Sequence, residues 1–365
     1  MRKILFISCL IIFTNQISNA KLLIEKLSSN DEDPVYAKIS INNKEHYWIT
    51  SRQIINENKI YSQMRIESMN CSKNIKPKLL KIPETYLIIN PLSQSKILPP
   101  LIASMDSKGT WSIHQLRKNL SSVKKSKKLQ KILSIKSIFS TSNGYLIGGT
   151  DYEKRPFLQL VNQNLKTIKN IKHTEITNGE ISQILENKEN IAIIFNAYKN
   201  QTDKKPKSPE IWIHSKDGES ISRIRLNGIG VYAAEIENGE FAISYWENNV
   251  LHVERRNNKM EIIWVLKLHE RKGIASDTGQ LLITGNEIAW IGANEDRLLI
   301  HRISKDGKII YTKIDKESNI KVPVAQNYSA QSYGNELHIR GTFYENTPYP
   351  YGKFMEFCLI NHPEK

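Results

Sequence analysis

The strongest constraint on the fold is a short apolar motif that returns about every 48 residues. It first occurs as Asn-Gly-Tyr-Leu-Ile-Gly-Gly at positions 143–149, and four altered copies follow. The first large apolar residues of the copies are separated by 46, 50, 47 and 49 residues, and they are Tyr145, Ile191, Phe241, Ile288 and Leu337. A repeat of this length is typical of structural units that are stacked in a row or closed into a ring.

Each full repeat has the same internal order, and this order predicts four short strands. A β-rich segment comes first, the motif follows, and a variable loop leads to a third strand, a two-residue turn and a fourth strand. The turns are Gln163-Asn164, Asp217-Gly218, Asn257-Asn258 and Asp306-Gly307, and such pairs suit tight hairpins. Because no long run shows the 3.6-residue period of a helix, the repeat predicts an all-β propeller of four-stranded blades. A solenoid or a series of sandwiches is the alternative.

The repeats predict three parts of the chain: residues 1–20, 21–79 and 80–365. Residues 80–128 form a degenerate first repeat, and five repeats follow at 129–173, 174–227, 228–270, 271–319 and 320–365. We therefore expect about six blades, or seven if residues 30–79 form a blade themselves. The last repeat lacks residues for a fourth strand, and an exposed strand edge promotes aggregation. We expect an N-terminal strand to close the ring, and Lys59–Ser68 is our candidate.

Two cysteines support this closure. Cys71 follows the candidate closing strand, and Cys358 lies on the third strand of the last repeat. We predict that they form a disulfide that locks the ring, worth roughly 4–5 kcal/mol in the chain-entropy model. Two unpaired buried thiols are the alternative.

The first 20 residues have the pattern of a secretory signal peptide. Arg2 and Lys3 precede an apolar run from Ile4 to Phe13, and small residues lead to Ala20. We predict cleavage after Ala20, and a periplasmic or secreted protein with no transmembrane segment. A buried N-terminal strand and a lipoprotein processed at Cys9 are the alternatives.

The chain is basic, with a formal net charge of +15 that falls to +13 without residues 1–20. A coding bias toward Lys, Asn and Ile accounts for this excess without any function. The functional interpretation is attraction to an acidic surface such as lipid headgroups, anionic glycans or nucleic acid, although no nucleic-acid motif is found. The lysine-rich run 124–128 could bind phosphate by charge alone, but we expect a solvated strand edge there.

Aromatic residues recur after the second strand of several repeats, where propeller ligands commonly bind. Tyr and Trp bury a large area with few rotatable bonds, and a lysine cluster lies beside them in sequence. The predicted ligand-binding residues are Tyr152, Tyr198, Trp246, Tyr344, Tyr349, Tyr351, Lys204 and Lys205. The alternative is that these aromatic side chains pack between neighbouring blades.

Motifs for catalysis or cofactors are missing from the sequence. Glycosidases need two facing carboxylates, and nothing pairs the loop candidates Asp151, Glu153, Glu247 and Glu345. His114, His252 and His301 fall on equivalent third strands, too far apart to share a metal ion. We predict no cofactor and no metal site.

Two segments resemble known families. Ser104–Trp111 resembles the Asp box of sialidase-type repeats with its glycine one place late, and residues 215–218 and 304–307 are similar to fragments of it. The box is a structural turn, so this resemblance implies the fold and not the activity. Within residues 21–79, Tyr47-Trp-Ile, a long alternating strand and Asn70-Cys-Ser are similar to the β module of bacterial surface-adhesin E-like proteins.

Together these features predict an exported, non-catalytic binding protein of the bacterial envelope or surface. Its expected partner is an envelope or host-surface glycan, or another protein. A glycan-cleaving hydrolase or lyase and a structural scaffold of an envelope complex are the alternatives.

The processing site can be tested by the mass of the exported protein. We expect a chain that starts at Lys21, because cleavage after Ala20 fits the small residues before it. A lipid attached to Cys9, or a chain that keeps Met1, would show the prediction to be wrong.

Overall fold

The structure is a computed structural model. It describes residues 21–26, 35–41, 45–56, 59–71, 78–83, 98–106, 108–141, 143–172, 179–186, 190–197, 208–215, 219–236, 239–270, 279–294, 297–314, 328–344 and 354–363. The predicted signal peptide lies outside these residues.

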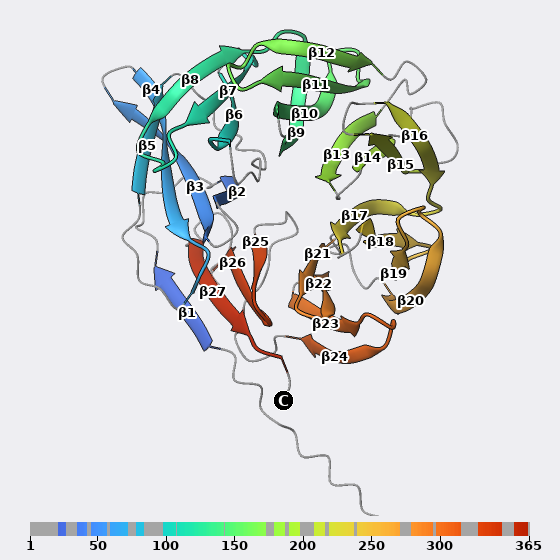
Figure 1. Ribbon diagram of the computed structural model, residues 1–365. Helices are drawn as coiled ribbons and strands as arrows, with labels where there is room; N and C mark the ends of the chain where they lie inside the picture. Colours follow the sequence, from blue (N-terminus) through green and yellow to red (C-terminus); the bar gives the residue numbers. More distant parts are fainter. Residues whose placement is uncertain are drawn as a thin grey trace, which may run out of the picture.

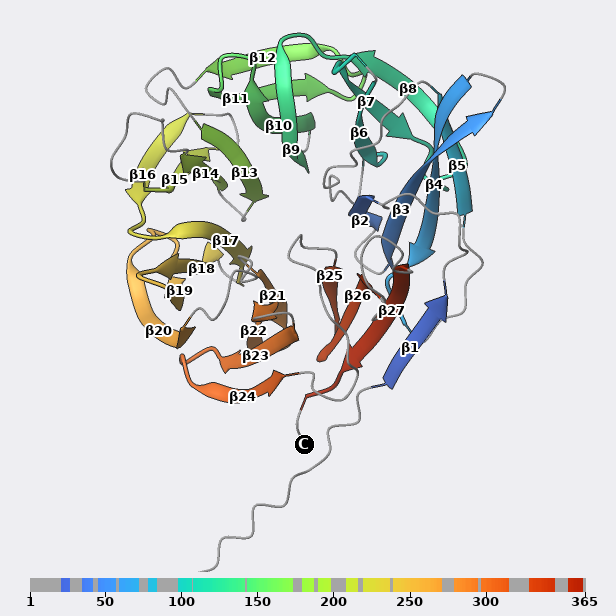
Figure 2. The same cartoon turned by 180° about the vertical axis from the view of Figure 1, so that it is seen from behind.

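The described residues form seven antiparallel sheets that are arranged in a ring (Figure 1), as the view from behind also shows (Figure 2). Six sheets have four strands and one has three. No α-helix occurs in the described ranges. The predicted all-β class and four-stranded units are therefore confirmed.

The first half of the ring contains three sheets. The strands are β2 (Val35–Ile41), β3 (Glu45–Asn56), β4 (Lys59–Ser68) and β5 (Lys78–Pro83) in the first; β6 (Leu101–Met105), β7 (Trp111–Leu116) and β8 (Val123–Lys128) in the second; and β9 (Ile132–Ser140), β10 (Gly144–Asp151), β11 (Pro156–Asn162) and β12 (Thr167–Lys172) in the third.

The second half contains four sheets. The strands are β13 (Gly179–Glu186), β14 (Asn190–Ala197), β15 (Glu210–Ser215) and β16 (Ser220–Arg225); β17 (Ile229–Glu235), β18 (Phe241–Glu247), β19 (Val250–Arg256) and β20 (Ile262–Glu270); β21 (Gln280–Thr284), β22 (Glu287–Asn294), β23 (Arg297–Ser304) and β24 (Ile309–Ile314); and β25 (Tyr328–Tyr333), β26 (Glu336–Tyr344) and β27 (Phe354–Asn361) with β1 (Lys21–Lys26).

The preferred count of six units missed the sheet formed by β2–β5. Residues 35–83 build a complete four-stranded sheet, as the alternative with seven units required. The next sheet has three described strands, and residues 84–97 before it lie outside the described residues.

The last sheet is closed by β1 and not by Lys59–Ser68. β1 pairs antiparallel with β27, where Leu23 is opposite Cys358. Lys59–Ser68 is instead β4, with β3 on one edge and β5 on the other. The prediction was wrong because β3 and β4 form one long hairpin, in which Asn56 is paired with Lys59, so neither edge of β4 is available to β27.

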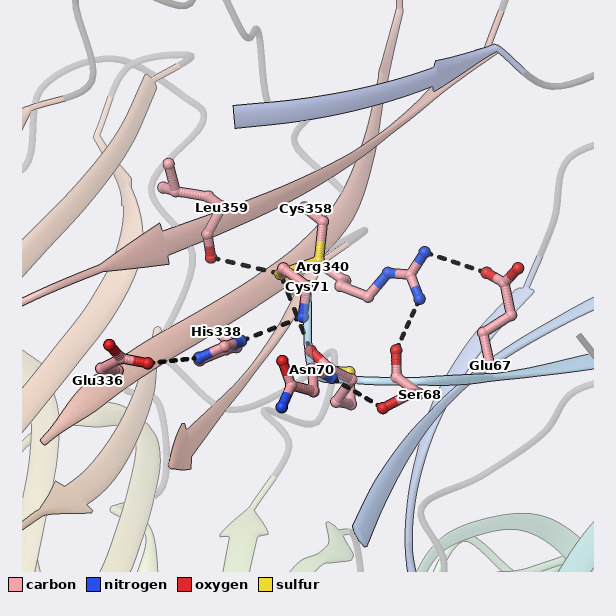
Figure 3. Close-up of a disulfide and its surroundings, with 10 residues drawn as sticks. Glu67, Ser68, Asn70, Cys71, Glu336, His338, Arg340, Cys358 and Leu359 are labelled. Atoms are coloured by element: carbon pink, nitrogen blue, oxygen red, sulfur yellow. Dashed lines mark hydrogen bonds and ion pairs between the residues drawn. A yellow bond between two sulfur atoms is a disulfide. The ribbon is translucent and has the colours of Figure 1, made fainter. Parts of the chain in front are cut away.

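The predicted disulfide between Cys71 and Cys358 is confirmed, with a Cα–Cα distance of 5.6 Å. It joins the first sheet to the last (Figure 3). Beside it the Cys71 amide donates to His338 Nδ1 at 3.1 Å. Arg340 donates to the Ser68 carbonyl at 2.8 Å and to the Glu67 carboxylate at 3.0 Å. We call this contact between the first and last sheets the closing joint.

Three described turns between third and fourth strands, at residues 163–165, 258–260 and 305–307, contain three residues where the sequence predicted two. In the β11–β12 turn, the Asn162 amide donates to the Lys166 carbonyl at 2.9 Å, and Asn162 Oδ1 accepts from the Asn164 and Lys166 amides at 2.9 Å each. Leu165, the third loop residue, has a φ of 63°, as this turn class requires. The sequence did not indicate this third turn residue, because the position holds a buried leucine and not the glycine that usually adopts a positive φ.

Removing the disulfide is expected to weaken the whole ring. Changing Cys71 and Cys358 to Ala should lower the free energy of unfolding by roughly 4–5 kcal/mol, because the unfolded chain loses a long closed loop. Denaturant unfolding measures this loss. Reduction should destabilise the native protein equally and leave the double variant unchanged. Two free thiols in the non-reduced native protein would contradict the prediction.

Candidate functional site

The positive charge of the chain is concentrated in two neighbouring sheets. Residues 108–172, which make up these sheets apart from β6 and Asp106 in the β6–β7 turn, contain 14 lysines and arginines against 2 acids, a net +12 of the +15 for the whole chain. The other residues together carry only +3. A uniform coding bias would spread the excess along the chain, so this local concentration calls for a structural or functional reason.

The two acids of this region are bound to an arginine of their own turn. Arg155 Nε lies 3.3 Å from Asp151 Oδ2, and the same guanidinium contacts Glu153. Asp151 Oδ1 also accepts the backbone amides of Glu153 at 2.9 Å and Arg155 at 2.8 Å. These carboxylates are therefore occupied within the β10–β11 turn and do not neutralise the lysines.

Strand β8 places two of its lysines on one face. Lys125 is paired with Gln115 and Lys127 with Ile113 on β7, and alternate residues of a strand share a face. Ile113 packs in the apolar cluster between this sheet and the next, which includes Tyr145. Lys125 and Lys127 therefore face the neighbouring sheet β9–β12. Their strand, β8, lies at the outer edge of the ring (Figure 1).

Both amines reach the β11–β12 hairpin. Lys125 Nζ donates to Asn164 Oδ1 at 2.7 Å, and Lys127 Nζ donates to Thr167 Oγ1 at 2.7 Å. A hollow of about 520 Å³ lies here, lined by Lys125, Ser126, Lys127, Asn164, Leu165, Lys166 and Thr167. We call these residues the basic groove.

The groove presents unused donors and a high positive charge. An ammonium group has three N–H donors, so the hydrogen bonds to Asn164 and Thr167 leave two donors each on Lys125 and Lys127. Partial burial lowers the pKa of Lys127, because desolvation disfavours its charged form. Among the described residues, no carboxylate forms an ion pair with Lys125, Lys127 or Lys166. A bound anion would supply the missing negative charge.

The predicted aromatic site is only partly described. Tyr152 is 58% exposed on the β10–β11 turn. Trp246 is buried and packs between the β17–β20 and β21–β24 sheets, with its ring centroid 5.4 Å from that of His269. This packing agrees with the alternative that the aromatic side chains pack between neighbouring blades, and the ligand-binding role of Trp246 stays a prediction. Tyr344 ends β26, and Tyr198, Tyr349, Tyr351, Lys204 and Lys205 lie outside the described residues.

The predicted carboxylates do not assemble a catalytic pair in the described residues. Asp151 and Glu153 bind Arg155, as above, and Glu247 lies 3.8 Å from His252 Nε2. Glu345 lies outside the described residues.

The three histidines singled out in the sequence lie on β7, β19 and β23. His114 lies between Ser104 Oγ at 2.6 Å and Ser126 Oγ at 2.8 Å. His301 lies between His269 at 3.0 Å and Thr312 Oγ1 at 2.8 Å. No group of three or more potential ligands for a metal ion occurs in the described part of the chain. The described residues also contain no helix long and apolar enough to cross a membrane.

The sequence pattern favoured the aromatic loops as the ligand site, and the lysine run at 124–128 was expected to be a solvated strand edge. Asn164, Lys166 and Thr167 were not predicted as groove residues, because only the fold brings the β11–β12 turn beside β8. The available signal was the local charge imbalance of residues 108–172, which a chain-wide sum conceals.

Comparison with known proteins shows the fold. No protein-family model and no curated protein matches the sequence. The chain is similar to the Dos1 propeller, with a TM-score of 0.58 and 10% identity over 94% of this chain and 95% of that one. It is also similar to the WD40 domain of Toxoplasma gondii coronin, with a TM-score of 0.54 and 10% identity over 95% and 88% of the two chains.

The polysaccharide lyase Uly1 is a third similar structure, with a TM-score of 0.51 and 10% identity over 92% of this chain and 91% of that one. At such identities the likeness shows the fold alone, so the chain is a β-propeller. The resemblance of residues 21–79 to the adhesin-like module stays a prediction.

The histidine pair predicts how stability depends on pH. Burial lowers the pKa of His269 to about 4, and burial together with the neighbouring His269 lowers the pKa of His301 to about 3. Both rings are near pKa 6.5 in the unfolded chain, so the unfolded state takes up protons first as the pH falls. Stability should be retained above pH 6.5 and fall steadily towards pH 3–4.

This pH dependence can be measured by denaturant unfolding across that range. Replacing His301 by Gln should lower the stability at neutral pH but flatten the slope by up to about 1.4 kcal/mol per pH unit, since one titrating group is lost. An unchanged slope would show that His301 is not one of the responsible groups.

Proposed function

We propose that this β-propeller is an exported, non-catalytic binding protein of the bacterial envelope or surface, and that it binds an anionic ligand in the basic groove. The observation that carries the proposal is the convergence of Lys125, Lys127 and Lys166 on one hollow. These lysines belong to a region with a net charge of +12. Export rests on the signal-like pattern of residues 1–20.

Non-catalytic binding is supported by the state of the acidic residues. The two carboxylates within residues 108–172 are held by Arg155, and the sequence has no nucleophile motif. The groove offers ammonium, amide and hydroxyl groups, which bind anions by charge and hydrogen bonds. A carboxylate pair of the kind that glycosidases use is not among its lining residues.

The rival functions have less support. The polysaccharide lyase among the similar structures shares 10% of residues with this chain, and that likeness concerns the fold. A purely structural scaffold would not explain why the net positive charge is concentrated in residues 108–172.

Retention on an immobilised sulfated polysaccharide tests the proposal. The double variant Lys125→Gln/Lys127→Gln should elute at lower salt and bind about tenfold more weakly, because each exposed ion pair contributes about 0.2–1 kcal/mol. The matched control is Lys267→Gln/Lys308→Gln, which removes the same charge from β20 and the β23–β24 turn. Lys308 has the turn position that Lys166 has in the β11–β12 turn.

The control distinguishes binding at the basic groove from general electrostatic attraction to a basic protein. The control pair should bind like the native protein. Equal losses in the two double variants would mean that only net charge matters, and the proposed site would be wrong. No retention of the native protein would contradict anionic binding itself.

A further inference from the structure

We infer that the ligand of the basic groove is a linear acidic polysaccharide that lies along the outer edge of the β6–β8 and β9–β12 sheets. This inference rests on the proposed function and names the class of its ligand. It follows from three features: the separation of the amines, the open form of the groove, and the chemistry of its lining.

The amines are held apart. Lys125 and Lys127 are two residues apart on one face of β8, so their Cα atoms are separated by roughly 7 Å along the strand. Each amine is tied to a different residue of the opposite hairpin, Lys125 to Asn164 and Lys127 to Thr167. Each amine can therefore bind its own anionic group, and a chain that carries such groups in succession would supply both.

The groove holds three cations from two sheets. Lys166 is exposed in the β11–β12 turn, opposite Lys125 and Lys127 of β8, whereas Lys124 and Lys128 alternate with these residues and lie on the other face of the strand. A small anion would use only part of this surface. A polymer with a charge on each repeating unit would use all three amines, and several weak contacts would then add up.

The groove is open along its length. Of its seven lining residues, only Leu165 is buried, and Lys127 is half-buried. β8 is the outermost described strand of its sheet, as β12 is of its own. A chain can therefore enter at one end and leave at the other, as binding within a long polymer requires.

The lining favours a polysaccharide over single-stranded nucleic acid. Nucleic-acid grooves combine positive charge with aromatic rings on which bases stack, and none of the seven lining residues is aromatic. Asn164 and Thr167 instead offer amide and hydroxyl groups that can bond to sugar hydroxyls.

Calorimetric titration of the full mature chain with anionic oligosaccharides of increasing length tests the inference. The probes are heparin-derived disaccharide, tetrasaccharide and octasaccharide, with oligogalacturonates of matched length to separate carboxylate from sulfate recognition. Inorganic phosphate and a single-stranded oligonucleotide complete the set. We expect affinity to rise with length in at least one oligosaccharide series and phosphate to bind far more weakly.

The salt dependence counts the contacts. The slope of log affinity against log salt falls by roughly 0.7–0.9 for each anionic contact that is lost. Lys125→Gln/Lys127→Gln should therefore reduce the slope for the octasaccharide by about 1.4–1.8, and Lys267→Gln/Lys308→Gln should leave it unchanged. The single change Lys166→Gln should reduce it by about half as much, which provides a second reading if the double variant folds poorly.

The outcomes distinguish this inference from the proposed function. If the disaccharide or phosphate binds as tightly as the octasaccharide and the groove variants weaken that binding, the groove is an anion site but the linear ligand is wrong. If the oligonucleotide binds more tightly than the oligosaccharides through the same lysines, the polysaccharide class is wrong. If no anion binds, both the inference and the proposed function fail.

Discussion

A ring of sheets depends on the joint where its two ends meet. The other joints are filled by apolar clusters, such as Ala289, Ile291, Tyr328 and Ile339 between the last two sheets. At the closing joint, the apolar cluster among the described side chains is Cys71, Cys358 and Ile360. Within the last sheet β1 pairs with β27, and the closing joint also holds the disulfide and the buried contact of Arg340 with Glu67. Breaking one member of such a buried pair costs about 3–5 kcal/mol.

The same ring sets the geometry of the basic groove. The groove lies between two sheets, and the distance from Lys127 to Thr167 depends on how those sheets are held. Tyr145 donates to the Pro99 carbonyl at 2.6 Å, and Gln115 donates to Tyr145 and to the Gln163 carbonyl at 3.1 Å each. These buried and part-buried bonds join the two sheets next to the lysines, so they fix the positions of the strands that carry the flexible cationic side chains. A binding site on such a base loses little order when a ligand arrives.

Local sequence patterns predicted the repeating architecture. Features that depend on pairing between distant residues, such as the closing strand, could not be predicted from them. The recurrence of Tyr145 and its counterparts predicted the second strand of each unit, because buried alternating residues repeat with the sheet. The closing strand could not be chosen from pattern alone, since Lys21–Lys26 and Lys59–Ser68 both look like strands and only the whole ring decides which one reaches β27. The turns misled for a chemical reason: Asn162 holds its turn with a side-chain oxygen, and Leu165 adopts the left-handed conformation while its side chain enters the core.

The site was harder to predict than the fold, because binding residues follow no period. Trp246 occupies a repeated aromatic position, and it serves sheet packing. Lys127 and Thr167 are 40 residues apart, and nothing local couples them. The net charge of each repeat, counted separately, would have indicated the groove, because the excess of lysine and arginine falls in two neighbouring sheets.

The pairing of β1 with β27 also has a consequence for how the protein is made. Lys21 is opposite Ile360, so the first described strand must wait for the last one before the circle can form. While the chain is synthesised, β1 emerges before the other described strands and stays without its partner until almost all of them have followed. Pairings between such distant residues form slowly, and unpaired edges aggregate. A newly made chain therefore has an unpaired edge on β27 until Lys21 and Ile360 have met.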